Sequence, residues 1–341
     1  MLMRRITSWD ELLAAFRALG GTAENVVQRE GPLGRGIHPI DPARPVRLHV
    51  PKSLLIPESA IEVRDGGLRV KGESVASPEA RDFFETYHAF ASWGGGGERE
   101  VLDFLSGIRG LPAPVASALR KELSLEFLFE EPAADTVRER FLKNRSITSG
   151  NTVVAMPMVE LVNHSPDGVS YDTSNGVTVA GRFDGEVLVR YNLADTYLRF
   201  VHYGFVAGER FAFSLPMGVR HRRGALTIQQ DYDVNRMHGD VPIPLTSTKG
   251  NELVLSHALL GDRKNPYAPR AVFQQVVQRA VGIEEAEAQE LFDQIVMANR
   301  MQFLKVLAAC EEADGPMVLQ VRRMCRLQLE ALSSCLIRRR N

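Results

Sequence analysis

Cysteine is scarce in this chain. The only three, Cys310, Cys325 and Cys335, are scattered through the last stretch, in segments that we expect to be helical. The sequence contains no CxxC motif and no Cys/His cluster, which argues against a structural zinc site and leads us to expect no metal. An odd number of scattered cysteines favours a reducing compartment, so we expect a cytoplasmic protein.

The chain also lacks an excess of charge of either sign and any long apolar run. Its 41 basic and 42 acidic residues give a net charge of −1, so no overall field draws it toward nucleic acid. No run approaches the roughly 20 apolar residues that span a bilayer, so we expect no membrane partner. The opening stretch MLMRRITSWDELLAAFRALGG contains acids and a helical period but no continuous apolar core, unlike a signal peptide.

The first half of the chain mixes short strands with a helical region. Ser8 and the acids after it predict a helix that ends at Gly20-Gly21. Alternation in VRLHV predicts a strand over 46–50, stopped by Pro51. Residues 78–145 have a helical pattern, interrupted at Gly94–Gly97. We interpret that glycine run as a flexible joint, because neither a preceding strand nor a following GK[ST] supports a phosphate-binding loop.

The second half turns back to short strands and then to helices. From Asn151 to about Tyr232, short apolar segments alternate with Gly and Asp, which indicates strands. From Asn251 onward the apolar spacing predicts an almost wholly helical region. Because the strands are grouped apart from the helices, the sequence predicts an α+β fold with a C-terminal helical module.

Three polar features stand out against this background. The apolar run MVELV ends abruptly in Asn163-His164, two side chains that form hydrogen bonds readily and do not suit a strand core. Two tyrosines follow, Tyr191 and Tyr203, each at the end of its own apolar run. The pair Asn163-His164 and the two phenols predict a small cavity rather than a packed core.

These features occur in an order that resembles the SET-domain methyltransferases. The similarity is to the branch of the Rubisco large-subunit lysine methyltransferase and the actin-histidine methyltransferase. The stretches that carry it are GPLGRGIHPIDPARPVRLHVPKSLLI, FLKNRSI, VVAMPMVELVNHS, FDGEVLVRYN and RFVHYGFV. The resemblance implies a first half of the SET domain with an N-terminal helix over 1–77, a helical insert over 78–145, a second half over 146–235, and a helical domain over 236–341 on which a protein or peptide substrate docks. It also implies a knot-like core, in which the chain with the last tyrosine threads the Asn-His corner.

The same resemblance implies S-adenosyl-L-methionine as the methyl donor and assigns roles to individual residues. Arg145 would bind the donor's carboxylate as a bidentate fork, Asn163 its ammonium end, and His164 the adenine through its main chain. Tyr191 would line the acceptor channel beside the donor, and Tyr203 would lie near the transferred methyl group. The residues that resemblance assigns to donor binding are Gly34, Arg35, Gly36, Ile37, Arg145, Asn163, His164 and Tyr191, and those it assigns to catalysis are Tyr191 and Tyr203.

Methyl transfer to an amine explains why phenols suit such a channel. The accepting nitrogen must be neutral, and deprotonating a lysine of pKa about 10.4 at pH 7 costs about 4–5 kcal/mol. A dry, apolar channel lowers that cost because it disfavours the ammonium. Tyrosine is neutral at pH 7, its ring excludes water, and its hydroxyl can orient the nitrogen lone pair.

Each motif alone has a simpler interpretation. Gly34-Arg35-Gly36 fits a surface turn, Arg145 a solvated helix end, and Asn163-His164 a capping or turn pair. If its stretch is extended, His202 points away from the face of Tyr203 and is structural. Asp231, Asp233 and His238 have a spacing that fits no standard metal-ligand set.

The chain also departs from the family pattern at three positions. Glu160 replaces an Asp, Asn192 follows Tyr191 where Gly or Asp is usual, and Tyr197 is an extra phenol that would narrow the channel.

Together the motifs predict an S-adenosylmethionine-dependent N-methyltransferase that acts on a protein side chain, with lysine as the expected acceptor. Two alternatives remain open. One is a methyltransferase for a peptide or small metabolite, suggested by Tyr197 and the short glycine-rich insert. The other is a non-catalytic SET-like module that binds a protein partner, which would have a filled or occluded donor site.

Overall fold

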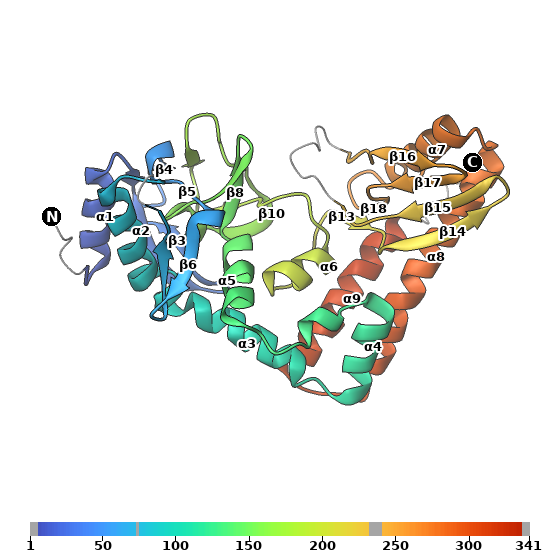
Figure 1. Cartoon of the computed structure of the whole chain (residues 1–341), viewed down its shortest axis with the longest axis horizontal. Helices are drawn as coiled ribbons and strands as arrows, with labels where there is room; N and C mark the ends of the chain where they lie inside the picture. The colour runs from blue at the N-terminus through green and yellow to red at the C-terminus, as the bar shows by residue number, and fades with distance from the viewer. Residues whose placement is uncertain (1–5, 73–74, 232–240, 336–341) are drawn as a thin grey trace. The chain divides into compact units, whose positions relative to one another are not determined.

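The fold is described from a computed structural model of the chain, which covers residues 6–72, 75–231 and 241–335 (Figure 1). The chain divides into two compact units. The first contains residues 1–105 and 131–191, and the second contains residues 106–130 and 192–341. Helical residues of the predicted insert are therefore shared between the units, with one boundary inside the helix α3.

The secondary structure is a mixture of helices and short strands, as the α+β prediction requires. The helices are α1 (Trp9–Ala18), α2 (Pro78–Ala91), α3 (Glu98–Arg109), α4 (Ala113–Leu123), α5 (Ala134–Lys143), α6 (Thr196–Leu198), α7 (Ala268–Val281), α8 (Glu285–Ala309) and α9 (Pro316–Ser334). A kinked segment, η3 (Trp93–Gly97), joins α2 to α3, and a π-helical turn, η6 (Arg199–Tyr203), follows α6.

Most strands of the first unit are short and pair in small sheets. They are β1 (Thr22–Glu24), β2 (Val26–Gly31), β3 (Gly34–Pro39), β4 (Val46–Val50), β5 (Ile56–Pro57), β6 (Ile61–Arg64), β7 (Gly67–Val70), β8 (Ser146–Ser149), β9 (Thr152–Ala155), β10 (Asn163–Val169), β11 (Val177–Gly181) and β12 (Leu188–Val189). The sheet orders are β1-β4-β11, β5-β9-β8, and the pairs β2-β3, β6-β7 and β10-β12. Of these pairings only β10-β12 is parallel, with Asn163 paired to Leu188 and His164 to Val189.

Local signals explain the elements that the sequence predicted correctly. Ser8 accepts a hydrogen bond from the backbone N–H of Glu11 and caps α1 as expected. β4 covers the predicted residues Val46–Val50, and its burial alternates because successive side chains point to opposite faces.

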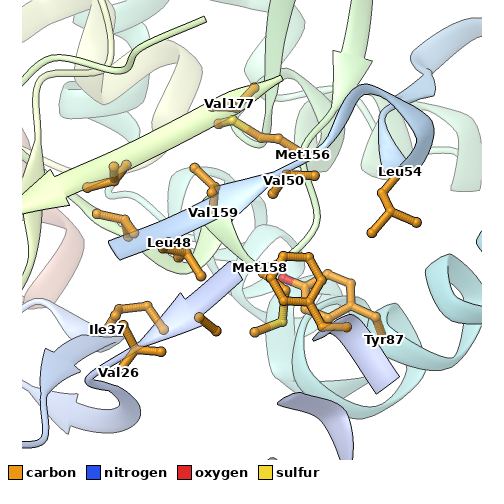
Figure 2. Packing of buried hydrophobic residues seen from close by; sticks show 14 of the residues in the cluster. Val26, Ile37, Leu48, Val50, Leu54, Tyr87, Met156, Met158, Val159 and Val177 are labelled. Atoms are coloured by element: carbon orange, nitrogen blue, oxygen red, sulfur yellow. The ribbon is translucent and has the colours of Figure 1, made fainter. Parts of the chain in front are cut away.

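The core of the first unit gathers around β4. Leu48 and Val50 are fully buried, and the side chains of Ile37, Met158 and Val159 join them in one cluster (Figure 2). The helices α1 and α2 lie beside the strands of this unit (Figure 1). The segment before Asn163 is thus anchored in the core, and the hairpin β2-β3 is anchored through Ile37.

The second unit packs helices against two sheets. Its strands are β13 (Phe211–Phe213), β14 (Met217–His221), β15 (Gly224–Ile228), β16 (Thr246–Lys249), β17 (Glu252–Leu255) and β18 (Leu259–Asp262). They form a sheet of order β14-β15-β17-β16 and a pair β13-β18. The helices α8 and α9 lie side by side, α4 packs against α8, and α9 packs against β13 and β18 (Figure 1).

One expectation about the second unit is wrong, and one conditional argument does not apply to it. The region after Asn251 is not almost wholly helical, because β17 and β18 precede the helices α7 to α9. Their apolar runs are only a few residues long, and such runs do not distinguish a buried strand from a turn of helix. The stretch before Tyr203 is a π-helical turn and not a strand, so the alternation argument for His202 does not apply.

Candidate functional site

The hairpin β2-β3 brings two glycines to the start of β3 for different reasons. Gly34 lies at the tight turn between the strands and has a φ of +87°, a conformation that would be strained in a residue with a side chain. A Cβ atom on Gly36 would collide with the carboxylate of Glu186 and lie 2.8 Å from the amide nitrogen of Asn163. Gly36 is therefore required by the close approach of two polar side chains.

Asn163 links the hairpin to the strand β12. Its amide nitrogen donates to the carbonyl of Arg35 at 3.1 Å and to Oε1 of Glu186 at 2.6 Å. Both partners are acceptors, which fixes the orientation of the amide and directs its oxygen elsewhere. The main chain adds a bond from the N–H of Val187 to the carbonyl of Ile37 at 2.8 Å.

His164 and Tyr191 bind each other beside this contact. Nδ1 of His164 accepts from the backbone N–H of Tyr191 at 3.2 Å, which requires that this nitrogen carry no proton. The hydroxyl of Tyr191 donates to the carbonyl of Val162 at 2.8 Å, and the two rings lie 5.1 Å apart. We call Gly36, Asn163, His164, Glu186 and Tyr191 the polar corner.

A strained turn fixes the approach to the polar corner. Met158 has a φ of 71° and a ψ of −51°, and the N–H of Val159 donates to the carbonyl of Pro157 at 2.9 Å, which is a γ-turn. Such a conformation costs about 1–3 kcal/mol in a residue other than glycine and persists only where the surroundings hold it. Met158 is fully buried beside Tyr87 (Figure 2), so the core holds this turn in place.

Glu160 is buried immediately after the γ-turn. Its Oε1 accepts from the hydroxyls of Tyr87, at 2.8 Å, and of Ser92. Burial raises the pKa of Glu160, and burial lowers the pKa of His88 to about 3. Although Nδ1 of His88 lies 3.8 Å from Oε1, both groups favour their neutral forms, so we do not regard this contact as an ion pair.

Arg145 and Arg35 share one carboxylate. The guanidinium of Arg145 lies 4.1 Å over the ring of Phe141, and its Nη2 is 3.2 Å from Oε2 of Glu100. Oε1 of the same glutamate is 3.4 Å from Nη2 of Arg35. We call the two arginines, Arg35 and Arg145, the arginine pair.

The glycine run lies at a kink between α2 and α3, where the sequence predicts a joint, and it packs against Arg35. A Cβ atom on Gly95 would lie 2.9 Å from Nη1 of Arg35, and one on Gly96 would lie 3.1 Å from Nη2. Gly96 also has a φ of +121° at a kink within η3. The run therefore lets the guanidinium of Arg35 lie directly against the backbone.

The first unit thus brings together every donor-binding residue predicted from the sequence. Arg35 joins the two groups, because its carbonyl binds Asn163 and its guanidinium pairs with Glu100. Sequence reasoning missed Glu186 and Glu100. Glu186 stood inside the quoted stretch FDGEVLVRYN, whereas an exposed acid in the first turn of a helix gave no signal for Glu100.

Tyr203 belongs to the second unit, at the end of η6. Its hydroxyl accepts from Nδ2 of Asn192 at 2.8 Å, and its ring lies 4.9 Å from the guanidinium carbon of Arg199. Arg199 is fully buried, 2.8 Å from Oε1 of Glu209 and 2.6 Å from Oδ1 of Asn192. Burial raises the pKa of Tyr203, so this phenol is neutral at pH 7. We call Asn192, Arg199, Tyr203 and Glu209 the tyrosine cluster.

The extra phenol Tyr197 is part of the core of the second unit. It is 4% exposed, its hydroxyl donates to the carbonyl of Leu123 at 3.2 Å, and its ring meets Phe303 edge to face at 5.8 Å. These contacts explain Tyr197 by packing within its own unit, and they give no support to the expectation that it narrows a channel.

Among the described residues, no group of three or more His, Cys, Asp and Glu side chains is arranged to hold a metal ion. Cys310, Cys325 and Cys335 are buried and free. Asp231 is exposed, while Asp233 and His238 lie outside the described residues. No helix in the described part of the chain is long and apolar enough to cross a membrane.

Comparisons with known proteins give no family assignment. No family model matches the chain, and no curated protein matches it significantly. The function must therefore be argued from the site itself.

Proposed function

We propose that this chain is an S-adenosylmethionine-dependent N-methyltransferase that acts on a protein side chain, with lysine as the favoured acceptor. The observation that carries the proposal is the pairing of opposite charges around Arg35. Its carbonyl meets Asn163 next to the acid Glu186, and its guanidinium meets Glu100 next to Arg145. Cations and acids in neighbouring positions suit the zwitterionic amino-acid end of this donor.

The residues present fit that donor in their chemistry. Arg145 offers a planar fork for a carboxylate. Asn163 and Glu186 offer oxygen acceptors for an ammonium group. Gly36 lets the side chains of Asn163 and Glu186 lie directly against the backbone of β3, so that both acceptors stand side by side.

The bound donor would supply an electrophilic methyl group on sulfur. In the transfer, the nitrogen lone pair forms a bond to the methyl carbon while the carbon–sulfur bond breaks. The protein's part is to position the amine and keep it neutral, and effective positioning supplies most of the rate. Tyr203, neutral in its buried setting, would orient the lone pair, and Tyr191 would border the donor.

The SET-like knot belongs to the same proposal. Docking of a protein substrate on the second unit is also part of the proposal. Met297, Met301 and Leu304 of α8 support the docking surface, because they are 50%, 47% and 39% exposed at helical spacing.

Calorimetric titration with S-adenosylmethionine and with its demethylated product is the first test of the proposal. Micromolar binding of either is the expected result, and binding of neither would overturn it. Mass spectrometry of a donor-supplemented lysate then compares the intact chain with Tyr203→Phe. The variant should lose most turnover and keep nearly the same donor affinity, whereas equal loss of both would contradict the role of Tyr203.

A non-catalytic protein-binding module is the second candidate. It is favoured by one observation, that Arg145 and Asn163 already bind carboxylates of the chain itself. The same titration separates the two candidates, because a module with an occluded site would bind no donor. The third reading, a small-metabolite acceptor, loses the support of Tyr197 because that side chain is buried in the second unit.

A further inference from the structure

The proposed function gives Glu100 no contact with the donor, although Glu100 contacts both members of the arginine pair. Arg145 is well covered, with 19% of its side chain exposed, and one face of its guanidinium lies over the Phe141 ring. The remaining donors lie in the guanidinium plane, and Glu100 binds at Nη2. Both edges at which Arg145 can bind a carboxylate through two parallel N–H bonds include Nη2, so a second carboxylate would lie beside Glu100 and be repelled by it.

The partners of this contact differ in how freely they can move. The side chain of Glu100 is 58% exposed and stands in the first turn of α3, where leaving the arginines returns it to water. Arg35 is confined by the backbone of Gly95 and Gly96, and Arg145 by Phe141. Glu100 is therefore the group that an incoming carboxylate displaces.

We infer that Glu100 competes with the donor's carboxylate for Arg35 and Arg145 and thereby sets the affinity of this site for the donor. The inference rests on the proposed function and adds an affinity-determining residue to it. A partly exposed ion pair suits this role, because such pairs are weak enough to be exchanged and are screened by salt.

The test compares three forms of the full chain: the unchanged protein, Glu100→Gln and Asp103→Asn. Asp103 is a matched control, because it stands on the same helix, is 71% exposed and pairs with Arg99 at 3.5 Å. Each form is titrated with S-adenosylhomocysteine and with 5′-methylthioadenosine, which lacks the amino-acid end and its carboxylate. Titrations are run at about 0.05 M and about 0.5 M salt, and thermal melts check that the variants fold.

Glu100→Gln should bind S-adenosylhomocysteine about two- to five-fold more tightly at low salt, and the gain should shrink at high salt. Its affinity for 5′-methylthioadenosine should not change, and Asp103→Asn should leave both affinities unchanged.

An unchanged or weaker affinity of Glu100→Gln for S-adenosylhomocysteine would overturn the inference alone, since the unchanged protein still binds. An equal gain for both nucleosides would also overturn it, because the effect would not depend on the carboxylate. If no folded form binds either nucleoside, the proposed function fails and the inference fails with it.

Discussion

The arginine pair and the tyrosine cluster use the same chemistry in two different settings. In each, a guanidinium lies over an aromatic ring and meets a glutamate, at 4.1 Å and 3.2 Å for Arg145 and at 4.9 Å and 2.8 Å for Arg199. The side chains of Arg145 and Glu100 are 19% and 58% exposed, whereas those of Arg199 and Glu209 are 0% and 5% exposed. Arg145 can therefore exchange Glu100 for a carboxylate of a ligand. Arg199 and Glu209 stay paired and support the tyrosine cluster.

The largest effect should come from breaking the buried pair. Arg199→Met leaves the carboxylate of Glu209 buried without its cation, and we expect the free energy of unfolding to fall by about 3–5 kcal/mol. Chemical denaturation measures the change. Arg263→Met in the same unit is the control, because Arg263 and Glu330 are 33% and 62% exposed and should contribute less than about 1 kcal/mol. Equal losses in both variants would remove the distinction between fixed and exchangeable pairs.

The stability of the first unit should depend on pH through His88, which is neutral in the folded chain. His88 has a pKa lowered to about 3 by burial, so the stability it contributes is complete above about pH 6.5 and is lost as the pH falls toward about 3. The loss should be about 1.4 kcal/mol per pH unit, or about 3 kcal/mol by pH 4. His88→Phe should abolish this pH dependence, whether or not the substitution changes the free energy of unfolding at neutral pH.

The matching measurement in the second unit is His257→Phe. Burial lowers the pKa of His257 only to about 4, so its contribution is lost over a narrower range, from about pH 6.5 to about 4. Denaturation curves at several pH values should therefore show that, below pH 4, His257→Phe changes the pH dependence of the unfolding free energy less than His88→Phe does. If His88→Phe keeps the slope of the unchanged protein, His88 is not held neutral by its surroundings.

A methyl group at Gly36 should disturb the polar corner directly. Gly36→Ala places a Cβ atom against Glu186 and Asn163, and we expect a loss of about 1–3 kcal/mol together with weaker donor binding. Gly185→Ala is the control one residue from Glu186, since nothing lies within 4 Å of its added Cβ. The control should be neutral or stabilise by up to about 1 kcal/mol. Unchanged donor affinity in Gly36→Ala would separate the polar corner from donor binding.

The smallest effect concerns the hydroxyl of Tyr191. Tyr191→Phe removes its bond to the carbonyl of Val162 and should cost about 1 kcal/mol in thermal unfolding. Because this hydroxyl anchors the polar corner, donor affinity should fall with stability. Tyr203→Phe should instead reduce turnover at nearly constant donor affinity. The same pattern for both tyrosines would contradict the separate roles assigned to them.

The sequence predicted best what short-range chemistry determines. The cap at Ser8, the alternation in β4 and the motif around Asn163 are local patterns, and the structure has α1, β4 and the polar corner where they indicate. Gly36 was assigned to donor binding, and the side chains that occupy the space of its missing Cβ atom are those of Glu186 and Asn163.

What the sequence could not predict depends on contacts between distant segments. Glu100 is 45 residues from Arg145, and nothing about an acid in a first helical turn indicates two arginine partners. The short strands β17 and β18 owe their conformation to their partners β15, β16 and β13, not to a long local pattern. Tyr203 ends a helical turn whose buried arginine binds Asn192 and Glu209, contacts that residue spacing alone does not reveal.

The π-helical turn η6 has a consequence for comparisons with relatives. A π-helical turn contains one residue more than the α-helical turn it replaces, and such turns are often found at functional sites. η6 carries Arg199 and Tyr203. A homologue that lacks this site should therefore align with a gap of one residue there, so that gain or loss of function would be recorded as a single-residue insertion or deletion.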